Sequence, residues 1–201
     1  MRWRAAVGEL DSATLSTVRT RLGGLEEAGP VGSGGRLLVD RRLYVKVGIE
    51  DRKSALLTIV DALTTGEKIM LACESGEPES KESWLMILRN FKHRGLTFPQ
   101  LTVADGHLGI WAAFGEIHPT WEEQRCWNHK ITNVLNDLPK KAQQKAAELL
   151  KAMPHAETNA DCERRPDAFV RTYRQTDKKA VETLLRDWDR MVTFYSFPRE
   201  H

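Results

Sequence analysis

Two aspartates, Asp105 and Asp40, stand where a sheet protein could bind a divalent cation. Asp105 follows a short apolar strand predicted over residues 101–104 and precedes Gly106. It would therefore lie at the carboxyl end of a strand, which is the edge where open α/β sheets bind their ligands. The glycine would allow a sharp backbone turn beside the acid. Alternatively, Asp105 caps a helix that begins near His107.

Asp40 lies inside an apolar strand predicted over residues 36–50. A buried carboxylate in such a strand is costly unless it is paired or binds a metal. If this strand lies beside the one that ends at Asp105, the two acids could share Mg²⁺, a hard cation that uses few carboxylates. Two such ions could activate a water or a 3′-hydroxyl and stabilise the leaving oxygen in phosphoryl transfer. Alternatively, Asp40 points to solvent from an edge strand, next to Arg41 and Arg42.

A C-x2-H pair, Cys126 and His129, could also bind metal, because thiolate and imidazole are zinc ligands. One pair supplies only two ligands, and the nearest other candidates, His155 and Cys162, do not have the spacing of a second pair. The pattern is more typical of a packed cysteine and a hydrogen-bonded histidine than of a zinc site.

Several lysines follow this pair along the chain, among them Lys130, Lys140 and Lys141. Such a run could lie along a phosphate backbone, where each contact gives salt-dependent affinity. A solvated helix face, interleaved with Glu148, explains the same pattern. The sequence leaves both interpretations open.

The elements that would position these residues follow from hydrophobic periodicity and turn signals. In order, they are strands over residues 36–50, 54–64 and 68–75, a helix over 81–95, a strand over 100–106, a helix over 107–119 and a strand-to-helix segment over 122–130. The rest of the chain has a helical pattern, broken at Pro154 and Pro166. The order β-β-β-α-β-α-β predicts an α/β fold with a mixed sheet and helices packed on it. Ribonuclease-H-like folds have this order, and their first and fourth strands lie side by side.

We divide the chain into a poorly defined N-terminal segment and linker (1–35), a partial ribonuclease-H-like core (36–130) and a helical insertion region (131–201). The formal net charge of +2 permits nucleic acid as a partner without demanding it. Three widely spaced cysteines argue against a disulfide framework. No apolar run approaches the roughly 20 residues of a membrane span. We therefore expect a soluble cytoplasmic protein.

One stretch of the sequence carries a family signature, residues 103–140. An Asp-Gly pair after a strand is followed by Gly-hydrophobic-Trp, then Gln-Arg-Cys-Trp, His-Lys, Asn-Val-Leu and Leu-Pro. The matching residues are Asp105-Gly106, Gly109 to Trp111, Gln124 to Trp127, His129-Lys130, Asn133 to Leu135 and Leu138-Pro139. This signature resembles that of Mutator-type bacterial insertion-sequence transposases. The resemblance covers roughly residues 43–201 and is strongest over 81–140.

The resemblance implies a ribonuclease-H-like DDE core with a helical insertion before its final acid. It implies metal-dependent cleavage and strand transfer at the terminal inverted repeats of a transposable element, with Mg²⁺ or Mn²⁺ as the cofactor. Asp105 matches the second catalytic Asp, and Cys126 and His129 match a C-x2-H motif near the active site. The implied partners are terminal and target DNA and further copies of the chain, in the bacterial cytoplasm in association with the nucleoid.

The chain departs from the family pattern in two places. An ungapped match would put Arg41 at the position of the first catalytic Asp, whereas a one-residue shift puts Asp40 there, and we assign Asp40 on that basis. No residue matches the catalytic Glu, and Glu200 is not assigned to that role. We therefore expect this chain alone to be inactive in strand transfer. The alternatives are a non-catalytic regulator that binds DNA or a transposase, and an inactive gene remnant.

Overall fold

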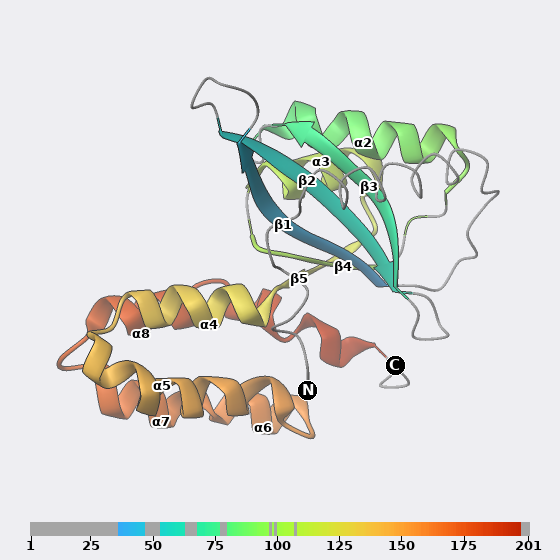
Figure 1. Cartoon of the computed structure of the whole chain (residues 1–201). Helices are drawn as coiled ribbons and strands as arrows, with labels where there is room; N and C mark the ends of the chain where they lie inside the picture. Colours follow the sequence, from blue (N-terminus) through green and yellow to red (C-terminus); the bar gives the residue numbers. More distant parts are fainter. Residues whose placement is uncertain are drawn as a thin grey trace.

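A mixed five-stranded sheet forms the first half of the molecule (Figure 1). The computed structural model describes residues 36–46, 53–62, 68–76, 80–96, 98, 100–106 and 108–197. The predicted N-terminal segment, residues 1–35, lies outside these described residues. The strands are β1 (Arg36–Lys46), β2 (Lys53–Ala62), β3 (Lys68–Gly76), β4 (Leu101–Ala104) and β5 (Glu122–Arg125). Their order across the sheet is β3-β2-β1-β4-β5.

The sheet changes from antiparallel to parallel at β1. The first three strands form an antiparallel meander, whereas β4 and β5 run parallel to β1. Because β1 pairs with both β2 and β4, it lies at the centre of the sheet. The sequence-based expectation that the first and fourth strands are neighbours is confirmed. The predicted β-β-β-α-β-α-β order followed by helices is confirmed as well.

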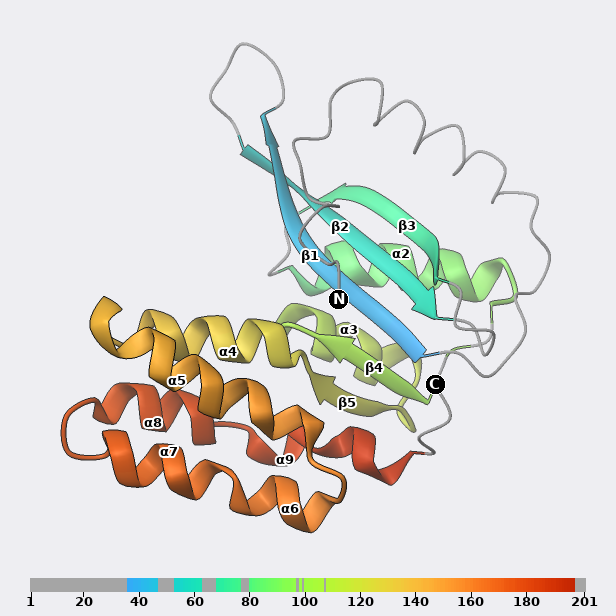
Figure 2. The same cartoon turned by 60° about the horizontal axis from the view of Figure 1, so that its bottom comes forward.

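Two helices cover one face of this sheet, α2 (Lys81–His93) and α3 (Leu108–Ile117) (Figure 2). Helix α2 begins where the Ser80 side chain accepts a hydrogen bond from the Ser83 amide, an arrangement typical of helix N-termini. Its apolar positions recur every three or four residues and are buried against the sheet and α3. The buried side chains of this first core include Leu57, Ile59, Trp84, Leu88, Phe91, Ile110 and Phe114.

The second half of the molecule is a helical region with its own core (Figures 1 and 2). Its elements are α4 (Trp127–Asn136), α5 (Lys140–Ala152), η1 (Met153–His155), α6 (Asn159–Arg164), α7 (Pro166–Tyr173), α8 (Lys178–Leu185), α9 (Trp188–Met191) and η2 (Thr193–Ser196). As predicted, the helices break at Pro154 and Pro166: α5 ends before the first and α7 begins at the second. The core joins α4, α5, α7 and α8 through residues such as Val134, Leu150, Phe169 and Leu184.

The helical region returns to the sheet at its end, where α9 and η2 lie beside β5 (Figure 2). This return brings residues more than 60 positions apart in sequence into contact. Among the described residues, no helix has both the length and the apolar composition needed to cross a membrane.

Candidate active site

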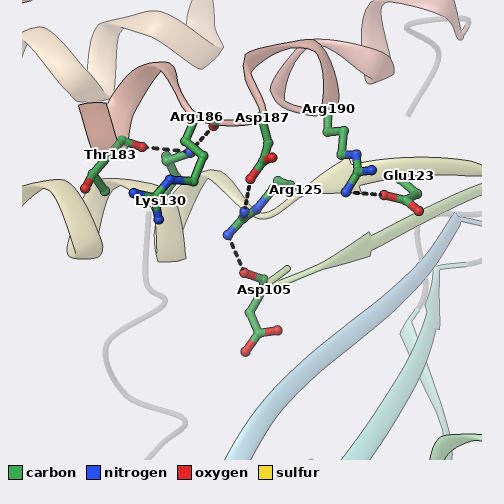
Figure 3. Close-up of polar contacts among 8 residues, drawn as sticks. All are labelled: Asp105, Glu123, Arg125, Lys130, Thr183, Arg186, Asp187 and Arg190. Atoms are coloured by element: carbon green, nitrogen blue, oxygen red, sulfur yellow. Dashed lines mark hydrogen bonds and ion pairs between the residues drawn. The ribbon is translucent and has the colours of Figure 1, made fainter. Parts of the chain in front are cut away.

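Asp105 lies immediately after β4, at the edge of the sheet where the parallel strands β4 and β5 have their carboxyl ends. The residue is half-buried. Its backbone carbonyl accepts a hydrogen bond from Nη2 of Arg125 at 2.9 Å (Figure 3). The following residue, Gly106, has a φ of +94°, a conformation that L side chains rarely adopt. Asp105 therefore lies at the start of a sharp, fixed turn on the ligand-binding edge of an α/β sheet.

Asp40 lies level with Asp105 in the sheet register. Strands β1 and β4 pair in parallel at Leu37 with Thr102 and at Leu38 with Val103, an offset of 65 residues. The same offset, continued two residues along both strands, brings the backbone of Asp40 beside that of Asp105. By this extension of the register, Asp40 in β1 is level with Asp105, the residue that directly follows the neighbouring strand β4.

A β-bulge directly follows Asp40. Asp40 lies opposite Thr58 of β2, but Leu43 lies opposite Leu56, so that β1 contains one more residue than its partner between these pairs. Bulges are frequent next to active sites, where they change the direction of a strand. One extra residue is also what the assignment of Asp40 requires, because the family pattern fits this chain only with a one-residue shift. The extra residue of the bulge lies between Asp40 and Leu43, which is where the one-residue shift would have to occur.

The C-x2-H pair adjoins the same edge of the sheet. The Cys126 amide donates to the carbonyl of Ala104 at 2.8 Å, which continues the pairing of β5 with β4. Burial raises the pKa of the Cys126 thiol, but hydrogen bonds from the side chain and backbone of His129 outweigh it and lower the pKa. The described residues include no group of three or more His, Cys, Asp or Glu side chains placed to hold a metal ion. The hydrogen bond between Cys126 and His129 joins the two side chains, and the Cys126 backbone lies against Ala104, the residue before Asp105.

Arg125, the last residue of β5, connects the Asp105 turn to the helical region (Figure 3). Its Nη1 forms an ion pair with Oδ2 of Asp187 at 2.5 Å while its Nη2 donates to the Asp105 carbonyl. Only 15% of the Arg125 side chain is exposed, so this ion pair is largely removed from solvent. The guanidinium group also fills the space in which a Cβ atom on Gly106 would lie.

Lys130 differs from the two other lysines proposed as phosphate contacts. It is 3% exposed, and its Nζ donates to the carbonyls of Thr183 at 2.8 Å and Arg186 at 2.5 Å (Figure 3). These carbonyls lie at the end of α8, where backbone acceptors lack partners within the helix. Burial, reinforced by the charge of Arg125, lowers the pKa of Lys130 to about 8. Its amino group thus binds backbone carbonyls inside the protein. Lys140 and Lys141, in contrast, are exposed at the start of α5.

The two residues that precede Arg125 also bind the returning segment. Gln124 is buried, donates to the carbonyl of Met191 at 2.9 Å and accepts from the amide of Phe194 at 3.0 Å. Glu123 forms an ion pair with Arg190 at 3.0 Å, although burial raises the pKa of its carboxyl group. The last three residues of β5, Glu123 to Arg125, therefore all contact the segment that runs from Asp187 through α9 into η2.

Sequence reasoning found the positions of Gln124 and Arg125 in the family signature but did not find their roles. Their partners lie more than 60 residues further along the chain. A local sequence pattern does not show contacts between residues so far apart. Asp187 was missed altogether. Its signal in the sequence is an acid between Arg186 and Trp188, which is equally typical of an ordinary exposed helix residue.

The fold and the site define an α/β protein with a mixed sheet, an aspartate, Asp105, at the carboxyl end of β4, and a helical region docked beside β5. The family model described as "Transposase, Mutator family" matches residues 37–201. The chain belongs to this family.

Curated relatives agree with this family membership. The chain is 43% identical over 167 residues to the transposase for insertion sequence element IST2 of Acidithiobacillus ferrooxidans, an alignment that covers 82% of this chain and 56% of the relative. It is 38% identical over 159 residues to the transposase for IS6120 of Mycolicibacterium smegmatis, covering 79% and 49% of the two chains. A third relative, the transposase for ISRM5 of Rhizobium meliloti, is 30% identical over 73% of this chain and 37% of its own length. The chain spans about half the length of the first two relatives.

Proposed function

We propose that this chain supplies part of the catalytic core of an insertion-sequence transposase, which moves its element by metal-dependent cleavage and strand transfer at the inverted repeats. The observation that carries the proposal is the parallel pairing of β1 with β4, in a member of the Mutator family. Extended by two residues, that register brings Asp40 level with Asp105, the residue that directly follows β4. The strand order β3-β2-β1-β4-β5 with α2 and α3 on one face supports a ribonuclease-H-like arrangement of this core.

Asp40 and Asp105 are the residues that would hold the metal. Two carboxylates fit Mg²⁺ or Mn²⁺, because hard divalent cations prefer oxygen ligands and keep further positions for water or phosphate. When bound, such ions make an attacking oxygen more nucleophilic and stabilise the charge on a leaving oxygen. The contribution of the protein is to bring the backbone of Asp40, within β1, level with Asp105 at the carboxyl end of β4, where Arg125 donates to the Asp105 carbonyl.

A second candidate function is that of a regulator that binds DNA or a complete transposase without cutting.

Exposed lysines at the start of α5 supply a specific observation in favour of DNA binding. Lys140, Lys141 and Lys145 are all exposed on this helix. Neighbouring cations can neutralise successive phosphates, and each such contact releases counterions. We propose that these lysines contact the DNA backbone, a role that the buried Lys130 does not share.

A gel-shift titration with DNA that carries the element's inverted repeats tests this function. We expect binding that weakens with salt, and a shallower salt dependence for the double variant Lys140→Gln/Lys141→Gln, by up to about one unit of slope for each lysine–phosphate pair removed. The control double variant, Lys92→Gln/Lys178→Gln, removes the same charge from exposed positions on α2 and α8 and should keep the parent slope. Preference for the repeats over unrelated duplex supports the transposase assignment. Failure to bind any DNA at low salt would overturn both DNA-dependent proposals.

A further inference from the structure

Arg125 makes three contacts with one guanidinium group, and each concerns either the Asp105 turn or the helical region. It donates to the Asp105 carbonyl, forms the ion pair with Asp187 and occupies the space beside Gly106. A planar guanidinium can satisfy partners in two directions at once, which an ammonium group does not do with the same geometry. The position of the Asp105 backbone is therefore set from the helical side of the molecule.

Asp187 has an unusual backbone conformation. Among the described residues, it is the non-glycine residue with a positive φ, 54°, and it lies between α8 and α9. Aspartate tolerates the left-handed region better than most residues, but the conformation still has a free-energy cost. Directly before it, the carbonyls of Thr183 and Arg186 are held by Lys130. The end of α8 is thus held by Lys130 of α4, and the Asp187 carboxylate that follows it pairs with Arg125 of β5 (Figure 3).

We propose that Arg125, oriented by Asp187, is a positioning residue that places Asp105 for metal binding and so makes metal affinity depend on the ion pair between Arg125 and Asp187. This inference rests on the proposed function and deepens it. Residues that orient a metal ligand without touching the metal commonly change its affinity strongly. Arg125 reaches Asp105 through its backbone carbonyl, one residue before the Gly106 turn, so a shift of the guanidinium moves the base of the Asp105 side chain.

The chain contains a matched control for this role. Arg190 of α9 forms an ion pair with Glu123, two residues before Arg125 on the same strand. Like the Arg125–Asp187 pair, the Arg190–Glu123 pair joins the helical region to β5. Its described contacts do not include Asp105 or Gly106. Removing either ion pair should loosen α9 from β5, whereas only the removal of Arg125 should change the geometry at Asp105.

Direct Mn²⁺ titration of the full chain, followed by the electron paramagnetic resonance signal of free Mn²⁺, tests the inference. We expect Arg125→Gln and Asp187→Asn to weaken Mn²⁺ binding by about tenfold or more, with Arg190→Gln equal to the parent. Arg125→Lys should not restore the affinity, because one ammonium group cannot reproduce the two-directional contact. Thermal melts without metal provide the structural comparison. We expect Arg125→Gln to lower the melting temperature more than Arg190→Gln, because the Arg125 side chain is 15% exposed and the Arg190 side chain 43%.

The outcomes separate this inference from the proposed function. If the parent binds Mn²⁺ and Arg125→Gln binds it equally well, the positioning role is wrong while the metal site stands. Equal decreases in affinity for Arg125→Gln and Arg190→Gln would show a general effect of docking and would also overturn it. If Arg125→Gln does not fold, the nearly isosteric variant Asp187→Asn serves as the test. A Mn²⁺ affinity equal to that of the parent in Asp187→Asn would contradict the inference. A parent chain that does not bind Mn²⁺ at all would refute the proposed function, and the inference with it.

Discussion

Gly106 lies against the guanidinium group of Arg125 with no room between them for a Cβ atom. Its φ of +94° is a second reason for glycine at this position. We therefore predict that Gly106→Ala lowers the free energy of unfolding by about 1–3 kcal/mol, from backbone strain and the displacement of Arg125. Chemical denaturation measures this decrease, and a variant as stable as the parent would show that the turn is not fixed as described.

Gly115 is the control for this substitution. It lies on the exposed side of α3, and a Cβ atom there would meet nothing within 4 Å. Because alanine is the better helix former, Gly115→Ala should raise the free energy of unfolding by about 0.5–1 kcal/mol. Glycine-to-alanine substitution should therefore lower the free energy of unfolding at Gly106 and raise it at Gly115.

Gln124 should be the residue that most directly holds the end of the helical region on the sheet. Gln124→Leu removes partners from the Met191 carbonyl and the Phe194 amide, and each buried polar group left without a partner costs about 1–3 kcal/mol. We predict a clear decrease in stability together with faster hydrogen exchange at the Phe194 amide. Gln144→Leu, at an exposed position on α5, should leave both quantities close to the parent. Unchanged exchange at Phe194 in Gln124→Leu would contradict the assignment.

Lys130 should contribute to stability and not to DNA affinity. Lys130→Met keeps the length of the side chain but removes the donor to the carbonyls of Thr183 and Arg186, at a cost of about 1–3 kcal/mol for buried acceptors left without a partner. Lys140→Met, on the exposed face of α5, should change stability by no more than about 0.5 kcal/mol. Equal denaturation midpoints for the two variants would contradict the role of Lys130 at the end of α8.

The depressed pKa of Lys130 predicts a dependence of stability on pH. Because the pKa is about 8 in the folded chain and near its ordinary 10.5 when unfolded, the unfolded state binds more protons between these values. The contribution of Lys130 to stability is therefore least favourable below pH 8 and improves as pH rises towards 10.5. The difference in unfolding free energy between the parent and Lys130→Met should increase over this window. A flat difference would mean that Lys130 titrates normally.

The strands, the helices and Asp105 could be predicted from the sequence because their signals are local. Alternating apolar residues, turn residues and an Asp-Gly pair after a strand all lie within a few positions of each other. The β-bulge after Asp40 could not, since it exists only in the pairing of β1 with β2. From the sequence alone, either Arg41 or Asp40 can be aligned with the first catalytic Asp of the family pattern.

Long-range contacts explain the remaining differences between sequence and structure. Lys130 belongs to a run of lysines in the sequence, yet its partners at the end of α8 lie more than 50 residues away and bury it. Arg125 and Asp187 are likewise 62 residues apart, and neither has a neighbour in sequence that indicates an ion pair. Spacing along the chain predicts which residues share an element, whereas contacts between elements depend on how the helical region folds back onto β5.

The most direct test of the two-acid site is the effect of Mg²⁺ or Mn²⁺ on thermal unfolding in the parent, Asp40→Asn, Asp105→Asn and the control Glu122→Gln. Glu122 is an exposed acid at the start of β5, at the other end of this strand from Arg125 and the Asp105 turn. A ligand that binds only the folded chain stabilises it by about 2.7 kcal/mol at a concentration 100-fold above its Kd. We predict that metal raises the melting temperature of the parent and of Glu122→Gln, and that either aspartate substitution removes the effect. An equal response to metal in Asp40→Asn, Asp105→Asn and the parent, or no response in the parent, would contradict a metal site built from Asp40 and Asp105.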